Sequence, residues 1–185
     1  AVLVFAVIIC LKDHSKIGFE KIAFFIVSVL FISLSFTSIV MLRNRFDRTA
    51  LLYLIIVIGS AWFSDTGAYF TGVFFGKHKL CPVISPKKTV EGLIGGIVSN
   101  ALLISLSAYI FVLVNAKLGL TVNINYFTLI LTAALSSLAG VAGDLTASVI
   151  KRQIGIKDYG NLIPGHGGIM DRFDSILFTA PTVYF

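Results

Sequence analysis

The amino-acid sequence predicts an all-α fold, a polytopic transmembrane helical bundle with a broken helix and a Gly-rich cytoplasmic loop. Of its 185 residues, 57% are hydrophobic and 13% are charged, whereas soluble globular domains average about 45–50% and about 25%. The uncharged run Ile22 to Leu42 is long enough to cross a bilayer. This composition excludes a disordered chain, a disulfide-rich secreted module, a coiled coil and an ordinary soluble enzyme.

Four long apolar stretches each predict a membrane span: Ile22 to Leu42, Thr49 to Phe75, Val90 to Val114 and Tyr126 to Ile150. As a single helix the second stretch would be about 40 Å long, more than a bilayer core of about 30 Å. Ser64-Asp65-Thr66-Gly67 in its middle is typical of a helix start, so we expect a break at Asp65 and a second half-helix over Ala68 to Phe75. A fifth apolar segment begins after polar turns at Ile169.

Both ends of the chain lie in apolar sequence. The first run, Ala1 to Leu11, is about half the length of a span. We therefore expect residues 1–185 to form a single membrane-embedded domain of a longer protein, without that protein's N-terminal spans. The residues that carry chemistry fall between Asp65 and Asp174, which makes 65–174 the expected catalytic region. Cys10 and Cys81 fit neither a disulfide framework nor a zinc site.

The distribution of Lys and Arg among the loops predicts which loops share a face. The formal net charge is +6, and its basic residues gather in loops, where they can meet anionic headgroups or an anionic substrate. The loop Ala116 to Asn125 is the poorest in Lys and Arg, so the positive-inside rule makes it external and places Lys77 to Glu91 and Lys151 to Gly168 on the cytoplasmic face. The rule leaves the N-terminal end unoriented, because Lys12 to Lys21 and Arg43 to Arg48 are both basic and are separated by one span.

Asp144 is the most informative single residue, because it follows a long uncharged run. A carboxylate at that depth costs about 2.5–3.5 kcal/mol on insertion scales. Two interpretations remain open: Asp144 caps a short helix, or it binds a hard cation in a polar cavity. At helical spacing Ser148, Lys151 and Arg152 share its face.

The loop Lys151 to Gly168 is rich in Gly and contains Pro164, so it cannot form a span. Its last residues, Gly165-His166-Gly167-Gly168, open the next helix, where backbone N–H groups and His166 would converge on an anion, better a phosphate than a carboxylate. Asp171 and Asp174 follow at i and i+3 and face one way. Two acids beside many cations indicate Mg²⁺ with a polyphosphate, although neither a Walker A motif nor a dinucleotide GxGxxG motif is present.

Two patterns carry a resemblance to a known family. Ser148-x-x-Lys151-Arg152-x4-Lys157-Asp158-x-Gly160-x-x-Ile163-Pro164-x-His166-Gly167-Gly168-Ile169-x-Asp171-Arg172-Phe173-Asp174 looks like the complete signature of the phosphatidate cytidylyltransferase (CDP-diglyceride synthase) family. A second region of that family resembles Asp65-Thr66-Gly67-Ala68-Tyr69, Gly72, Gly76-Lys77 and Ser85-Pro86-Lys87-Lys88-Thr89-Val90-Glu91-Gly92.

The resemblance implies the reaction CTP + phosphatidate → CDP-diacylglycerol + pyrophosphate, a nucleotidyl transfer in phospholipid biosynthesis. It implies Mg²⁺ as cofactor, with room for a second cation, and an integral protein of a bacterial inner (plasma) membrane with a cytoplasmic active site. The partners implied are CTP, phosphatidate and the lipid bilayer, with no nucleic acid; an oligomer is compatible with it.

Within that resemblance the acidic residues are assigned to the metal. Asp144 and Asp171 come from two helices that flank the loop and could bridge ions, with Asp174 as a second ligand or an orienting group. Asp65 is either a third ligand or a helix cap. We expect Glu91 to pair with Lys87 or Lys88.

The basic and small residues are assigned to phosphate. Lys151 and Arg152 in the catalytic set, and Lys157 and Arg172 as substrate-binding residues, would contact phosphates of CTP or of the lipid; the alternative is a solvated positive-inside cluster. Lys87 and Lys88 would clamp phosphate or bind anionic lipid. For His166 we favour phosphate contact over base catalysis. The remaining substrate-binding candidates are Ser148, Gly167 and Gly168.

Two other functions compete with this interpretation. One is a different CTP-dependent lipid kinase or cytidylyltransferase, whose metal and triphosphate apparatus would be similar. The other is an ion-coupled transporter in which Asp65 and Asp144 form an ion path through broken helices. The transporter would need no nucleotide, so CTP binding separates the two classes.

Overall fold

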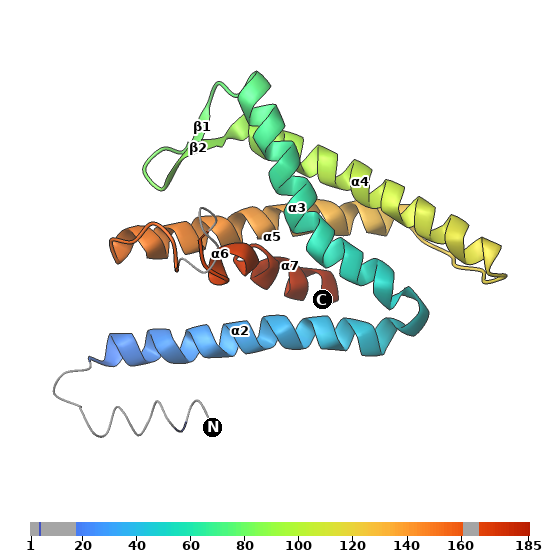
Figure 1. The fold of residues 1–185 in the computed structure, drawn as a ribbon, viewed down its shortest axis with the longest axis horizontal. Helices are drawn as coiled ribbons and strands as arrows, with labels where there is room; N and C mark the ends of the chain where they lie inside the picture. The colour runs from blue at the N-terminus through green and yellow to red at the C-terminus, as the bar shows by residue number, and fades with distance from the viewer. Residues whose placement is uncertain (1–3, 5–17, 161–166) are drawn as a thin grey trace.

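The structure is a computed structural model that describes residue 4, residues 18–160 and residues 167–185, and it consists of long helices with one small hairpin (Figure 1). In chain order the elements are α2 (Phe19–Phe46), the 3₁₀ turn η1 (Asp47–Thr49), α3 (Ala50–Phe75), β1 (Lys79–Cys81), β2 (Ser85–Thr89), α4 (Val90–Lys117), α5 (Tyr126–Gln153), α6 (Met170–Phe173) and α7 (Ile176–Tyr184).

The four predicted spans correspond to α2, α3, α4 and α5. Among the described residues these four helices are long and apolar enough to cross a membrane. Large apolar side chains such as Phe24, Trp62 and Leu102 are exposed on their surfaces, as expected where lipid rather than water is the solvent. The predicted all-α, polytopic membrane fold is confirmed.

The predicted break in the second span is wrong. α3 runs as one α-helix from Ala50 to Phe75, and Asp65 lies on its exposed side. Glycine is needed at position 67 for packing rather than for a helix start. A Cβ at Gly67 would overlap the side chain of Ser99 and lie 3.2 Å from the Gly95 carbonyl oxygen. Gly67 therefore permits the close approach of α4.

Small residues let α3 and α4 pack closely. Gly92 and Gly96 stand four residues apart on α4, and a Cβ at either would come within 2.8 Å of a carbonyl oxygen of α3, that of Ala68 or Ser64. This is the small-xxx-small pattern of helix pairs in membranes, where close backbone approach replaces the hydrophobic driving force. The α3–α4 pair thereby forms a rigid support for the hairpin that joins the two helices.

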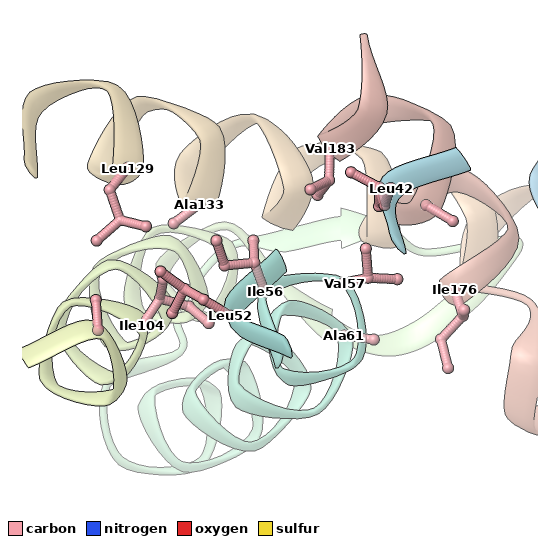
Figure 2. Packing of buried hydrophobic residues seen from close by; sticks show 12 residues of the cluster. Leu42, Leu52, Ile56, Val57, Ala61, Ile104, Leu129, Ala133, Ile176 and Val183 are labelled. Carbon is pink, nitrogen blue, oxygen red and sulfur yellow. The ribbon is translucent and has the colours of Figure 1, made fainter. Parts of the chain in front are cut away.

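The apolar core lies where α3, α4, α5 and α7 meet, with Leu42 of α2 at its side. Figure 2 shows side chains from these helices pointing toward one another. Two buried hydrogen bonds tie the short α7 into this core: Ser35 Oγ donates to the Leu177 carbonyl at 2.6 Å and Thr179 Oγ1 donates to the Val57 carbonyl at 3.2 Å. α7 thus holds α2 and α3 together.

The sequence did not predict the β-hairpin between α3 and α4. β1 and β2 are antiparallel, with Lys79 opposite Thr89 and Cys81 opposite Ser85. Lys87 and Lys88 lie in β2, so their backbone is extended. The hairpin and the C-terminal end of α5 lie at one end of the bundle, and the α4–α5 loop lies at the other (Figure 1).

Candidate active site

A cavity of about 470 Å³ lies beneath the hairpin, between α3, α4 and α5. Its lining combines two carboxylates with three cations. The charged lining residues are Asp65 from α3, Lys79 from β1, Lys87 and Lys88 from β2 and Asp144 from α5. Opposite charges from α3, β1, β2 and α5 thus line one cavity.

Lys88 and Asp144, which both line this cavity, form an ion pair. Lys88 Nζ lies 2.5 Å from Asp144 Oδ2, and the two side chains are 24% and 29% exposed. β2 ends where Thr89 caps α4, its hydroxyl accepting from the Gly92 backbone N–H at 3.0 Å. This cap fixes the end of the strand next to Lys88.

The expected pairing of Glu91 with Lys87 or Lys88 is wrong. Glu91 instead lies against His78, with 2.6 Å between His78 Nδ1 and Glu91 Oε1. The i−3 and i−4 spacing brings side chains together only within a helix, and both lysines precede α4 in an extended strand. The partner of Lys88 lies on α5.

Asp65 contributes a second carboxylate to the same cavity. Its side chain comes from α3 and, in the described part of the chain, has no hydrogen-bonding or ion-pair partner. Ser148 on α5 approaches the other carboxylate, with Oγ 3.5 Å from Asp144 Oδ1. The cavity therefore holds one paired and one unpaired carboxylate.

A second ion pair, Lys151 with Asp171, lies further along α5. Lys151 Nζ is 2.8 Å from Asp171 Oδ1, and the side chains are 12% and 8% exposed. Asp171 Oδ2 also accepts from the backbone N–H groups of Tyr159, at 2.8 Å, and Gly168, at 3.0 Å. Although burial acts to raise it, these donors hold the pKa of Asp171 below its usual range.

The loop around this second pair is shaped by glycine and Tyr159. Gly167 has φ +79°, and a Cβ there would lie 3.0 Å from Asp171 Oδ2. The Tyr159 ring lies 5.4 Å from Lys151 Nζ, and its hydroxyl donates to the Ala147 carbonyl at 3.3 Å. Tyr159 thus anchors the described part of the loop on α5, a role that no sequence pattern indicated.

Asp174 is buried between α6 and α7. Its Oδ1 accepts from the Ser175 backbone N–H at 2.7 Å. Burial raises the pKa of Asp174 to about 6, and the negative charge of Asp144 adds to the shift. Asp174 lines a second, largely apolar cavity of about 260 Å³, which also touches Gly143 and Tyr159.

The remaining predicted residues lie around these groups. Arg152, Lys157 and Arg172 are exposed, and Gly167 and Gly168 are buried. His166 lies outside the described residues. The structure therefore brings Asp65, Lys87, Lys88 and Asp144 into one cavity, and joins Lys151, Asp171 and Gly168 in a neighbouring network. The roles assigned to these residues stay predictions.

The carboxylates differ in how well they suit a metal. Within the described residues, no three acidic, His or Cys side chains lie close enough together to hold one ion. Asp171 already accepts from Lys151 and two backbone N–H groups. Asp65 and Asp144 line one cavity, and their oxygens are the donors that a hard divalent cation takes. This pair fits such an ion best.

Comparison with known proteins identifies the family. Residues 1–185 match the cytidylyltransferase family along their whole length. The chain belongs to the cytidylyltransferase family. This confirms the resemblance found in the sequence patterns, and the four apolar helices make this member an integral membrane protein.

Several curated relatives are similar to this chain. Phosphatidate cytidylyltransferase of Bacillus subtilis (strain 168) is 44% identical over 167 residues, which cover 90% of this chain and 58% of that protein. The proteins of the same name from Staphylococcus saprophyticus and Staphylococcus haemolyticus are 40% and 39% identical over 169 residues, covering 91% of this chain and 60% of each relative. The chain spans about three-fifths of the length of these relatives.

Proposed function

We propose that this protein is a phosphatidate cytidylyltransferase, which converts CTP and phosphatidate into CDP-diacylglycerol and pyrophosphate. The observation that carries this proposal is membership of the cytidylyltransferase family together with 44% identity to a relative of that name. The cavity beneath the hairpin supports it, because lysines and carboxylates gather there at one end of an apolar bundle.

The proposed reaction needs no protein nucleophile. A phosphate oxygen of phosphatidate attacks the α-phosphorus of CTP, a new P–O bond forms, and the bond to the pyrophosphate leaving group breaks. Both reactants are anions, so the protein must hold them in line and neutralise their charge. In a cavity with low-dielectric walls, fixed cations do this more effectively than water does.

Lys87 and Lys88 are the cations that we assign to the phosphates. Lys87 is exposed and Lys88 is half-buried, and both line the cavity. Lys88 pairs with a single partly exposed carboxylate, so an incoming phosphate can take the place of Asp144 as its partner. Arg152, Lys157 and Arg172 are exposed, and we assign them to further phosphate contacts with CTP or the lipid.

We also propose that catalysis depends on Mg²⁺, with Asp144 and Asp65 holding it and Asp174 nearby as a further candidate. When bound, the metal would supply positive charge to the triphosphate. Asp144 is freed for this role when Lys88 turns to phosphate. Asp171, which already accepts from Lys151 and two backbone N–H groups, would instead keep the loop in place beside the site. A second cation stays a prediction.

The test is an incubation with labelled CTP, phosphatidate and Mg²⁺, scored for CDP-diacylglycerol and pyrophosphate. It should be run on this chain and on a version extended to the length of the relatives. Product that needs Mg²⁺ supports the proposal. Transfer to a different lipid would indicate the related lipid enzyme, and solute movement in liposomes without CTP binding would indicate the transporter.

The cytoplasmic placement of the site has its own test. A Cys-free version carrying Val83→Cys places a thiol at the exposed hairpin turn, and Leu118→Cys places one at the opposite end. A membrane-impermeant thiol reagent should label the first only in inside-out vesicles and the second only in right-side-out vesicles. The reverse pattern would contradict the orientation and leave the proposed reaction standing.

A further inference from the structure

Glu91 lies in the first turn of α4, outside the cavity, and holds the junction between α3 and β1. Its Oε2 accepts from the backbone N–H groups of Lys77, at 3.1 Å, and His78, at 3.2 Å. The ring of His78 adds a third contact, with Nδ1 2.6 Å from Oε1. One carboxylate therefore binds two of the three residues that connect the end of α3 to the hairpin.

The same junction is attached to α4 by the backbone as well. The Val90 backbone N–H donates to the His78 carbonyl at 2.9 Å, directly beside the carboxylate contacts. α3 ends at Phe75, and the backbone N–H of its C-cap Gly76 donates to the Gly72 carbonyl at 3.1 Å. The base of the hairpin is thus fixed between the last turn of α3 and the first turn of α4.

The position of this base determines where the lysines of β2 lie. β1 begins at Lys79, immediately after His78, and pairs with β2. A shift of the base would move β2 relative to α5, and with it the Nζ of Lys88 relative to Asp144. The hydrogen bonds that hold the base of the hairpin therefore also determine the position of Lys88.

We propose that Glu91 is a positioning residue: by holding the α3–β1 junction, it keeps the hairpin in place so that Lys87 and Lys88 face the cavity. Neither Glu91 nor His78 lines the cavity, so Glu91 acts through the hairpin. The effect on substrate binding rests on the proposed function. The position of the hairpin does not, because it can be measured without substrate.

If Glu91 only stabilised the fold, Glu91→Ala would lower the melting temperature. A positioning residue should behave differently. The His78 side chain is 77% exposed and that of Glu91 is 25% exposed, so water can reach the released N–H groups when the carboxylate is removed. α3 and α4 would remain packed through their glycines. Glu91→Ala should therefore leave the melting temperature close to that of the wild type while the hairpin becomes looser.

The first experiment measures the hairpin directly. In the full protein with Cys10→Ala and Cys81→Ala, spin labels at Val83→Cys in the turn and Ile154→Cys beyond α5 report the distance between the hairpin and α5. Adding Glu91→Ala should broaden the distance distribution. Glu91→Gln should broaden it less, because its amide oxygen still accepts. Glu20→Ala, the matched control in the first turn of α2, should leave it unchanged. An unchanged distribution in Glu91→Ala would overturn the proposal.

The second experiment measures the consequence for substrate, using CTP with phosphatidate in vesicles. Glu91→Ala should raise KM for CTP on the order of tenfold with little change in kcat, Glu91→Gln should recover most of the loss, and His78→Ala should have a smaller effect because the backbone contacts persist. Kinetics like those of Glu20→Ala would overturn the proposal. If the wild type makes no CDP-diacylglycerol, the proposed function fails, and the distance measurement still decides the role of Glu91.

Discussion

α5 carries one partner of each of two ion pairs, and the two pairs differ in how firmly their carboxylates are held. Asp144 and Lys151 stand about two turns apart on the helix. Asp144 pairs with Lys88 of the hairpin, and both side chains are about a quarter exposed. Asp171, the partner of Lys151, is 8% exposed and accepts from two backbone N–H groups as well.

The difference separates a structural carboxylate from an exchangeable one. A carboxylate whose oxygens are taken by backbone donors orders the chain around it, and replacing those donors costs the loop its shape. A carboxylate paired with a single ammonium group, at the end of a flexible side chain, can exchange that partner for a cation. We therefore expect the Lys88–Asp144 pair to matter mainly for activity and the Lys151–Asp171 pair to matter for stability too.

The largest expected effect is that of Asp144→Asn on activity. The substitution keeps the size and hydrogen-bonding capacity but removes the charge on which cation binding depends, so CDP-diacylglycerol formation should fall on the order of 10²- to 10³-fold. The melting temperature should change little, because the amide oxygen of the new side chain can still accept from Lys88 Nζ. The measurement is the initial rate at several Mg²⁺ concentrations, with Glu20→Gln as control. A fully active Asp144→Asn enzyme would show that the metal role is wrong.

Asp171→Ala should lower stability, which Asp144→Asn leaves nearly unchanged. Removal of the carboxylate leaves the Lys151 ammonium and the Tyr159 and Gly168 N–H groups without their acceptor, which should lower the free energy of unfolding by about 2–3 kcal/mol. Thermal unfolding in detergent measures this loss, and Asp144→Ala is the matched comparison. Equal melting temperatures for the two variants would remove the distinction between the pairs.

Lys88→Met should weaken substrate binding. Loss of a charge-assisted contact of about 1.5–3 kcal/mol predicts a KM for CTP at least about tenfold higher. Lys87→Met, at the more exposed neighbouring position, should have a smaller effect. Initial rates over a CTP series test this order. If Lys87→Met raised KM for CTP more than Lys88→Met does, Lys87 rather than Lys88 would be the main phosphate contact.

Gly167→Ala should show the smallest of these effects. Gly167 and Gly155 have similar positive φ values, +79° and +72°, but a Cβ at Gly155 meets nothing within 4 Å, whereas one at Gly167 meets Asp171 Oδ2. Both alanine variants carry a backbone cost of about 1 kcal/mol. Gly167→Ala should lose more stability than Gly155→Ala by thermal unfolding. Equal losses would indicate that Asp171 is not held tightly by the loop.

The positions of the spans were predictable from sequence because they depend on local properties. The starts of α4 at Val90 and α5 at Tyr126 agree with the first residues of the predicted stretches. Each follows a capping residue, Thr89 or Asn125, whose side chain accepts from the first turn. A long uncharged run must form backbone hydrogen bonds within itself when it lies in lipid, so composition determines both the helices and the membrane class.

The unbroken course of α3 and the hairpin were decided by tertiary structure. Asp65 and Gly67 carry the signal of a helix start, yet in the fold one lines the cavity and the other admits α4. Lys87 and Lys88 have a spacing that fits pairing with Glu91, but strand pairing directs Lys88 to Asp144. These outcomes depend on neighbours that are distant in the chain.

By itself the sequence determined the helical membrane class, the family and the set of charged residues available for chemistry. Only the tertiary structure decided which of these charges meet: Lys88 with Asp144 from β2 and α5, and Lys151 with Asp171 from α5 and α6. The physical reason is that burial and helix capping follow from residues a few positions apart, whereas an ion pair between distant segments forms only after helix packing has set the distance between them.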